Sequence, residues 1–401
     1  MLALDEALGL ILAAVPPPAS QLIPLAQAQG RILAEPLTAP IDLPPFDNSA
    51  MDGYAVRAAD VGSAQPEAPV GLRQIGKVAA GASFSGVVTA GTCVRLFTGS
   101  PLPRGADAVV MQEDTQVEPG PPETILIRDA VRVRENVRLR GEDIQRGSPL
   151  AAAGESLTAG RRSLLAATGL SQVRVGRPPV VGLLATGSEL QAPGQPLDYG
   201  QIYESNSIGL AALVQAAGGI PRCLPLVADV LSSTRTALAE AFQQCDAVVT
   251  SGGVSVGELD FLKRAFQDIG GELQFWKVAI KPGKPFVFGR WGEKLLFGLP
   301  GNPVSAFVTF LLLVRPALRR WQGATEVALP RHPGLLAEPL SNPGDRRHFL
   351  RVRVDAVGRV FSAGPQASHI LSGLAAANGL VDLAPQTALP AGATIEVLRW
   401  E

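Results

Sequence analysis

The chain has 401 residues, of which 46% are hydrophobic and 18% charged, and its formal net charge is -1. This composition excludes a disordered chain and provides enough apolar side chains for two to four domains. A net charge near zero argues against a general nucleic-acid or membrane-surface binder, so any anion site has to be local. Cys93, Cys223 and Cys245 show no CxxC spacing, which argues against disulfides or zinc and favours a cytoplasmic protein.

The first ten residues contain Asp5 and Glu6 and no basic run, so we expect no secretory signal. The longest apolar stretch, residues 303–314, is too short to span a bilayer, and we expect no transmembrane segment.

The first 57 residues predict a helix and then a polar loop. Apolar side chains recur at helical spacing over residues 4–15. The loop before a short strand at residues 54–56 contains Asp47, Asn48, Ser49 and Asp52. Two acids and an amide in one loop form a candidate site. Alternatively, these side chains form turns that hold their own backbone.

A small β domain is predicted next. Over residues 71–137, alternating runs such as residues 124–128 and 131–134 are separated by Gly and Pro. Arg138, Arg140, Glu142 and Asp143 then gather around a glycine. A surface salt-bridge network is the alternative explanation for most of these charges. Residues 156–168 predict a helix.

From residue 180 the sequence alternates between strands and helices. Strands are predicted at residues 180–185, 220–227, 247–249 and 273–280, and helices at residues 206–217, 233–243, 259–269 and 304–321. This alternation is typical of an α/β domain with a largely parallel sheet. Ligands bind such sheets beyond the carboxyl ends of the strands. We expect four polar loops to meet there, at residues 186–189, 228–229, 251–260 and 299–303.

The richest of these loops follows the strand at residues 247–249. Ser251, Gly252, Gly253 and Ser255 offer backbone N–H groups and hydroxyls to an anion, and Asp260 adds a carboxylate near the start of the next helix. Such donors beside acids suit a phosphate accompanied by a divalent cation. The alternative is a tight strand-to-helix turn capped by the same aspartate.

A second candidate anion site is the turn at Lys281 and Lys284, which flank a Pro-Gly pair. Two lysines held close together attract anions in a chain of nearly zero net charge. Two solvated lysines in a hairpin turn are the alternative.

After residue 330 the sequence predicts a small all-β domain. All three histidines, His332, His348 and His369, lie here, so we expect no histidine base in the α/β domain. The chain contains no GxxxxGK[ST], GxGxxG, HExxH or GxSxG motif. The remaining acids, lysines, arginines and glycine-backed N–H groups suit the neutralisation of phosphates and oxyanions better than acyl transfer.

Five motifs carry a resemblance to a known family. They are FDNSAMDGYA (residues 46–55), RGEDI (140–144), TSGGVSVGELDF (250–261), IKPGKPF (280–286) and GLPGNPVSA (298–306). Together they resemble the MoeA/gephyrin E-domain family of molybdopterin molybdenumtransferases, or molybdenum insertases. The resemblance covers essentially the whole chain.

The resemblance implies a multidomain α/β plus β fold with four parts. An extended dimerisation region comprises residues 1–44 and 141–176, and a small β domain is inserted at residues 45–140. A molybdopterin- and nucleotide-binding α/β domain with a central parallel sheet follows at residues 177–328, and a C-terminal, β-barrel-like domain at residues 329–401. The family forms homodimers.

The resemblance also implies the reaction. Molybdate and adenylylated molybdopterin are the substrates, Mg²⁺ assists, and molybdenum cofactor and AMP are released. Molybdopterin adenylyltransferase, which acts in the preceding step, and molybdoenzymes are the implied partners, with no role for nucleic acid or membranes.

The family's site residues match this chain one by one. Its catalytic positions match Asp52, Asp143, Asp260, Lys281 and Lys284, the first two reaching the partner subunit's site. Its cofactor-binding positions match Ser251, Gly252, Gly253, Ser255, Asp229, Pro300, Gly301, Asn302 and Pro303. The metal would be held by Asp260 and Glu189. Molybdate would be bound by Lys281 and Lys284, with Arg351 and Ser368 as weaker matches.

The chain departs from the family pattern at three positions. Ser188 and Glu204 stand where aspartate is usual, and Phe261 replaces a common tyrosine. The first departure puts one metal or nucleotide contact in doubt. Two alternatives to an insertase are an adenylyltransferase-like enzyme and a non-catalytic scaffold. The extra β domains argue against the former, and the intact acids and lysines argue against the latter.

Overall fold

The computed structural model describes residues 1–120, 122–253 and 261–400. Ser255 and Asp260, two of the predicted site residues, therefore lie outside the described residues. The chain divides into two compact units. The large unit contains Met1–Glu35, Ala153–Thr158 and Gln172–Glu401, and the small unit contains Pro36–Ala152 and Ala159–Ser171. The finer division into four domains stays a prediction.

The small unit is built on a six-stranded sheet with the order β7-β4-β6-β5-β9-β8. Its strands are β4 (Gly53–Val56), β5 (Val70–Val78), β6 (Thr92–Leu96), β7 (Ala108–Met111), β8 (Thr115–Glu118) and β9 (Thr124–Ile127). Short pairs join β2 (Leu37–Thr38) to β11 (Pro149–Ala151) and β3 (Asn48–Ser49) to β10 (Val137–Arg138). Two helices complete the unit, α2 (Ala58–Val61) and α3 (Ala159–Ala167). The predicted small β domain is thus confirmed.

The large unit is organised around a second six-stranded sheet with the order β16-β13-β17-β21-β20-β18. These strands are β13 (Val180–Ala185), β16 (Ile220–Cys223), β17 (Ala247–Ser251), β18 (Glu272–Lys277), β20 (Pro285–Trp291) and β21 (Lys294–Leu299). The first four strands in the order run parallel, whereas β20 is antiparallel to both of its neighbours, β21 and β18. Elsewhere in this unit β1 (Ser20–Pro24) pairs with β12 (Gln172–Gly176), and β14 (Leu190–Gln191) with β15 (Ile202–Tyr203).

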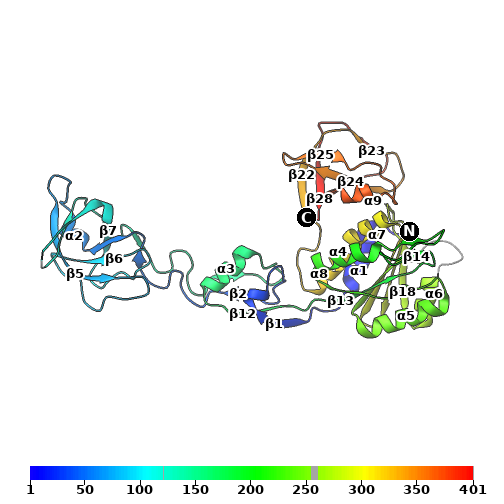
Figure 1. Ribbon diagram of the computed structural model, residues 1–401, viewed down its shortest axis with the longest axis horizontal. Helices are drawn as coiled ribbons and strands as arrows, with labels where there is room; N and C mark the ends of the chain where they lie inside the picture. The colour runs from blue at the N-terminus through cyan, green and yellow to red at the C-terminus, as the bar shows by residue number, and fades with distance from the viewer. Residues whose placement is uncertain (121, 254–260, 401) are drawn as a thin grey trace. The chain divides into compact units, whose positions relative to one another are not determined.

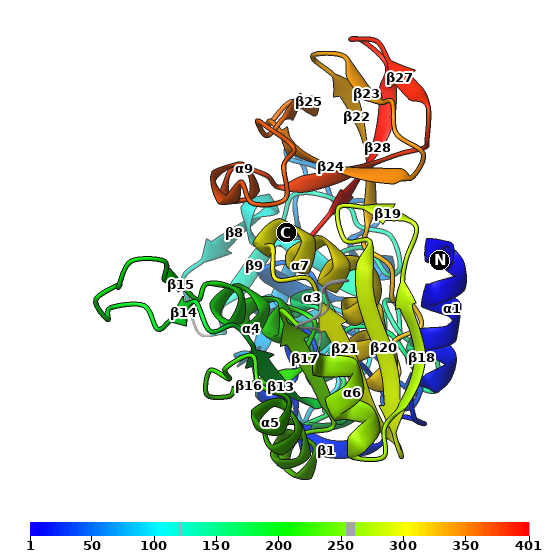
Figure 2. The ribbon, with the colours of Figure 1, turned by 90° about the vertical axis from the view of Figure 1, so that its right-hand side faces the viewer.

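Helices cover both faces of this sheet. One apolar core joins it to α1 (Leu4–Ala14), α4 (Asn206–Ala216), α7 (Pro303–Thr309) and α8 (Arg315–Trp321). The opposite face packs on α5 (Leu231–Gln244) and α6 (Phe261–Asp268), which lie side by side in Figure 2. Because both faces of the sheet are covered, its central strands are mostly apolar, and all five residues of β17 are buried.

Five strands near the C-terminus close into a barrel. They are β22 (Arg331–Leu336), β24 (Arg347–Val354), β25 (Arg359–Ser362), β26 (Gly379–Leu383) and β28 (Thr394–Arg399), and each pairs with two of the others. The short β19 (Ile280–Lys281) adds to the edge of β24, and β23 (Leu340–Asn342) pairs with β27 (Thr387–Leu389). Helix α9 (Leu371–Ala375) lies beside the barrel (Figure 1). The predicted barrel-like domain is confirmed.

Three predicted elements differ from the structure. Residues 131–134, predicted as a strand, form a turn in which Arg134 adopts a φ of 70°. The strand predicted to reach residue 227 ends at Cys223, before Pro225, which has no N–H for the sheet. The long predicted helix contains a π segment, Phe310–Val314, directly before Pro316, which cannot donate to the preceding turn. Among the described residues, no helix is long and apolar enough to cross a membrane.

Candidate functional site

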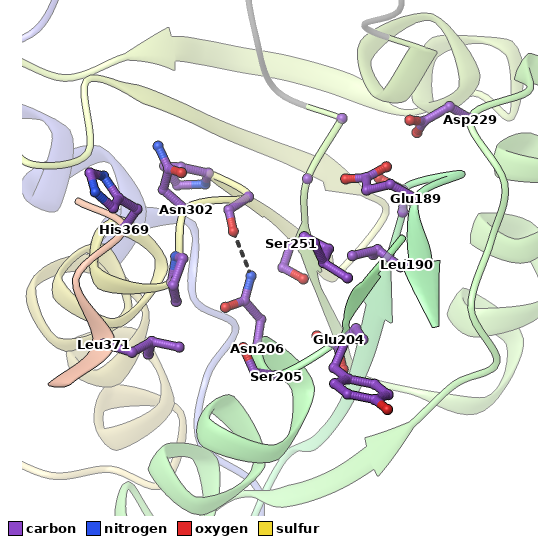
Figure 3. Close-up of a pocket in the computed structure, with 18 of the residues that line it drawn as sticks. Glu189, Leu190, Glu204, Ser205, Asn206, Asp229, Ser251, Asn302, His369 and Leu371 are labelled. Carbon is purple, nitrogen blue, oxygen red and sulfur yellow. Dashed lines mark hydrogen bonds between the residues drawn. The ribbon is translucent and has the colours of Figure 1, made fainter. Parts of the chain in front are cut away.

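A cavity of about 600 Å³, which we call the rim cavity, opens at the carboxyl ends of β13, β17 and β21. The loop after each strand contributes to its wall, as do the start of α4 and the barrel loop before α9. Figure 3 shows these side chains converging on one space. The structure thus brings together loops that lie more than a hundred residues apart in the sequence.

The glycine turn after β17 forms the floor of the rim cavity. Gly252 and Gly253 have φ angles of 95° and 66°, which side chains rarely tolerate. A Cβ on Gly252 would lie 2.4 Å from the backbone oxygen of Thr186. Thr186 belongs to the predicted loop at residues 186–189 but was given no role of its own. It lines the cavity, and its buried hydroxyl has no hydrogen-bond partner within the described residues. Its place directly after a buried strand was the available signal.

Two carboxylates line one side of the rim cavity. Glu189 and Asp229 lie next to each other, on the side opposite Asn302 and His369 (Figure 3). Burial raises the pKa of Asp229, and the negative charge of Glu189 raises it further. Oxygen ligands whose charges repel one another suit a hard divalent cation. The described residues contain no group of three or more metal-ligating side chains.

Two of the departures from the family pattern have structural partners. The hydroxyl of Ser188 accepts a hydrogen bond of 3.3 Å from the backbone N–H of Asp229, so it ties two loops together. The buried carboxylate of Glu204 accepts one of 2.9 Å from the backbone N–H of Ser207, in the first turn of α4. A carboxylate at a helix N-terminus is stabilising. Neither departure disrupts the wall of the cavity.

A second cavity, of about 540 Å³, lies at the lysine turn and is called the lysine cavity below. Lys281 and Lys284 line it together with Ser368 and Arg346. Gly283 packs so closely on α7 that a Cβ there would lie 2.3 Å from a methyl carbon of Thr309. Arg346 was not predicted as a site residue, although its place in a basic run was visible. Its guanidinium donates to the backbone oxygen of Ile280 at 2.9 Å.

Arg351 does not have the predicted role of an oxyanion contact in this structure. Its side chain is 1% exposed and absent from the lining of the lysine cavity. Its guanidinium donates to the backbone oxygens of Pro365, Ala367 and Ile370, at 2.6, 3.1 and 2.7 Å. Arg351 therefore holds the loop that carries Ser368.

The rim cavity and the lysine cavity adjoin each other. Pro285, Pro300, Asn302 and His369 line both of them. His369 of the C-terminal part thus reaches the strand ends of the α/β domain, and the absence of a histidine base in that domain stays a prediction. The barrel loop folds back over the carboxyl ends of the strands, and position along the chain does not reveal such a return.

Asp52 and Asp143 belong to the small unit. One carboxylate oxygen of Asp52 accepts hydrogen bonds from the backbone N–H and the hydroxyl of Thr98, at 2.7 and 2.8 Å. These bonds lower the pKa of Asp52. Asp143 has an exposed side chain. Asn48 donates to the backbone oxygen of Phe46, as the turn-forming alternative predicts, whereas Asp47 accepts from the backbone N–H of the distant Arg140.

This combination defines a class, that of molybdopterin-binding α/β domains with additional β domains. A family model described as a probable molybdopterin binding domain matches residues 182–320. Two further models, the MoeA N-terminal region (domain I and II) and the MoeA C-terminal region (domain IV), match residues 2–169 and 333–400. The chain belongs to the MoeA family.

Named proteins and solved structures similar to this chain support the assignment to the MoeA family. The chain is 37% identical over 404 residues to the molybdopterin molybdenumtransferase of Haemophilus influenzae, covering 99% of this chain and 98% of that protein. It is 39% identical over 385 residues to molybdopterin molybdenumtransferase 2 of Mycobacterium tuberculosis, covering 94% of each. The crystal structure of the molybdopterin biosynthesis MoeA protein from Pyrococcus horikoshii OT3 matches with a TM-score of 0.84 at 31% identity, covering 100% of both chains.

Proposed function

We propose that the protein is a molybdopterin molybdenumtransferase. Molybdate and adenylylated molybdopterin are its substrates, water cleaves the bond between the two phosphates, and AMP and molybdenum cofactor are released. The observation that carries this proposal is the shared wall between the rim cavity and the lysine cavity. A phosphate-bearing ligand in the first and an oxyanion in the second would lie next to each other.

The lysine cavity is the proposed molybdate site. Lys281, Lys284 and Arg346 supply positive charge to a dianion, and Ser368 supplies a hydroxyl. The rim cavity is the proposed site of the adenylylated cofactor. Ser251, Gly252 and Gly253 lie where a phosphate is expected in this fold, at the carboxyl ends of the strands.

Magnesium is part of the proposal. Glu189 and Asp229 offer oxygen ligands in the rim cavity, and burial together with the charge of Glu189 raises the pKa of Asp229, so a cation there would stabilise both carboxylates. Asp260, outside the described residues, is the proposed third ligand. A bound Mg²⁺ would offset the negative charge that gathers on the phosphates as AMP leaves.

We further propose that the protein acts as a cytoplasmic homodimer. In this arrangement Asp52 and Asp143 of one chain complete the site of the other. The supporting observation is that two hydrogen bonds from Thr98 fix one carboxylate oxygen of Asp52 and lower its pKa, as suits a residue that faces a metal or a cationic site. A molybdopterin adenylyltransferase would deliver the substrate, and molybdoenzymes would receive the product.

The proposed function is tested by incubating the purified protein with adenylylated molybdopterin, molybdate and MgCl₂. We expect AMP release that depends on both molybdate and Mg²⁺. AMP release that is independent of molybdate, or no release at all, would refute the assignment. Mixing a D52N chain with a K281A/K284A chain tests the dimer: shared sites predict partial recovery of activity in the mixture.

A further inference from the structure

The side chain of Asn302 departs from the usual behaviour of its position. Asn302 is the N-cap residue of α7, where an asparagine side chain normally accepts a hydrogen bond from a backbone N–H of the first turn. Here it makes no such bond. Instead its amide nitrogen donates to the hydroxyl oxygen of Ser368 at 3.1 Å.

One backbone N–H group in the first turn of α7 finds its hydrogen-bond acceptor outside the helix. The backbone N–H of Val304 donates to the backbone oxygen of Ser368 at 3.2 Å. Ser368 is therefore attached to the start of α7 at two points, through its backbone oxygen and its hydroxyl oxygen. The barrel loop is also held by Gln366. Its side chain accepts a hydrogen bond from the backbone N–H of buried Arg351 and donates one to the backbone oxygen of the same residue.

The bond from Asn302 determines what the Ser368 hydroxyl can do. A hydroxyl that accepts one hydrogen bond still has its single proton to donate. Within the part of the chain that the structure describes, Ser368 donates this proton to no other group. Ser368 lines the lysine cavity with Lys281 and Lys284, so the proton is available to an anion there.

Resting on the proposed function, we infer that Asn302 is a positioning residue for the oxyanion. By holding the oxygen of Ser368, it directs the hydroxyl proton into the lysine cavity, where it meets an oxygen of molybdate. Because Asn302 also lines the rim cavity, it joins the walls of both substrate sites.

A double-mutant cycle in molybdate binding tests this inference. Molybdate is titrated calorimetrically into the full-length protein and into N302A, S368A and N302A/S368A, and AMP is titrated separately. We expect each single variant to weaken molybdate binding about three- to tenfold, as for the loss of one hydrogen bond. The double variant should be no weaker than S368A, because Asn302 acts through Ser368. In S368A the dissociation constant for AMP should change less than about twofold, because Ser368 does not line the rim cavity.

Asn378→Ala is the matched control. Asn378 lies in the same barrel, bonds through its side chain to the backbone of Val354, and lines neither cavity. Molybdate binding should be unchanged in this variant. If N302A does not fold, N302D replaces it: the side chain keeps its shape but cannot donate, and binding should fall at least as far.

The outcomes distinguish failure of the inference about Asn302 from failure of the proposed function. Wild-type protein that binds molybdate and releases AMP, with N302A binding molybdate equally well, overturns this inference alone. Additive losses in the double variant also overturn it, since they would mean that Asn302 and Ser368 act independently. Wild-type protein that neither binds molybdate nor releases AMP overturns both the inference and the proposed function.

Discussion

Glu189 and Asp229 share one side of the rim cavity, and the charge of Glu189 adds to burial in raising the pKa of Asp229. Two ionised carboxylates placed together repel each other unless a proton or a cation lies between them. The ligand-free site is therefore less stable than it would be with one neutral partner, and the proposed cation would relieve this repulsion.

Asp229→Asn should stabilise the metal-free protein at neutral pH. An aspartate whose pKa is raised by folding loses stability as the pH rises from about 4, the unfolded value, through the folded value. The asparagine of the variant does not ionise, so the free energy of unfolding of the variant should exceed that of the wild-type protein by an amount that grows from pH 4 to pH 7. The difference should stay below about 1 kcal/mol, because solvent screens the half-buried pair. Urea unfolding in EDTA across this pH range measures it.

In the presence of Mg²⁺ the wild-type protein should become more stable than D229N. Cation binding to the native state stabilises the wild-type protein by mass action, and D229N should lose most of the effect. Glu240→Gln, which alters a carboxylate outside both cavities, is the control. Equal stabilisation of wild type and D229N by Mg²⁺ would remove Asp229 from the metal site.

Lys281→Ala/Lys284→Ala should weaken molybdate binding by about 100-fold or more, because two charge-assisted contacts are lost at about 1.5 kcal/mol each. AMP binding should change much less, since neither lysine lines the rim cavity. Lys277→Ala, on β18 and away from both cavities, is the matched control. Calorimetric titrations of both ligands distinguish this result from a general loss of folding, and equal losses for the two ligands would contradict it.

Gly252→Ala should be more harmful than Gly253→Ala. At Gly252 the added methyl group would meet a backbone oxygen at 2.4 Å, whereas at Gly253 its nearest neighbour is the hydroxyl oxygen of Thr186 at 3.0 Å, which can rotate. Both positions have positive φ, so both variants carry about 1 kcal/mol of strain. We expect G252A to lose a further 1–3 kcal/mol of unfolding free energy by overpacking. Equal stability of the two variants would show that the turn relaxes freely.

Much of the fold was predictable because its signals are local. The strand at Val180–Ala185 and the helix at Asn206–Ala216 follow from runs of apolar residues whose period a single segment displays. The strands β20 and β21 were not predicted, and the antiparallel direction of β20 depends on pairing between segments, which no single segment displays. Pro225 and Pro316 show how one residue without an N–H shortens a strand or widens a helix whose periodicity continues.

The candidate site was only partly predictable, because some of its residues stand in short motifs and others are brought in by contacts between distant segments. Gly252 and Lys281 stand in motifs whose chemistry is visible in a few consecutive residues. His369 enters the site through the return of the barrel loop, and Arg346 through its place directly before β24, and no short motif shows either. Arg351 was assigned as a weak match to the family's oxyanion contacts, whereas in this structure its buried guanidinium donates to backbone oxygens.

Arg351→Met should destabilise the protein by about 3 kcal/mol, because three backbone oxygens lose a buried, charged donor. Burial already lowers the pKa of this guanidinium, so the hydrogen bonds are what keep the charge inside. Arg353→Met, on the exposed face of the same strand, should lose less than about 1 kcal/mol. Arg351→Lys should recover only part of the loss, since an ammonium group cannot span all three oxygens. Chemical denaturation measures the stabilities, and molybdate titration of R351K gives the decisive comparison. A variant as stable as wild type but weak in molybdate binding would restore Arg351 to the role of a direct oxyanion contact.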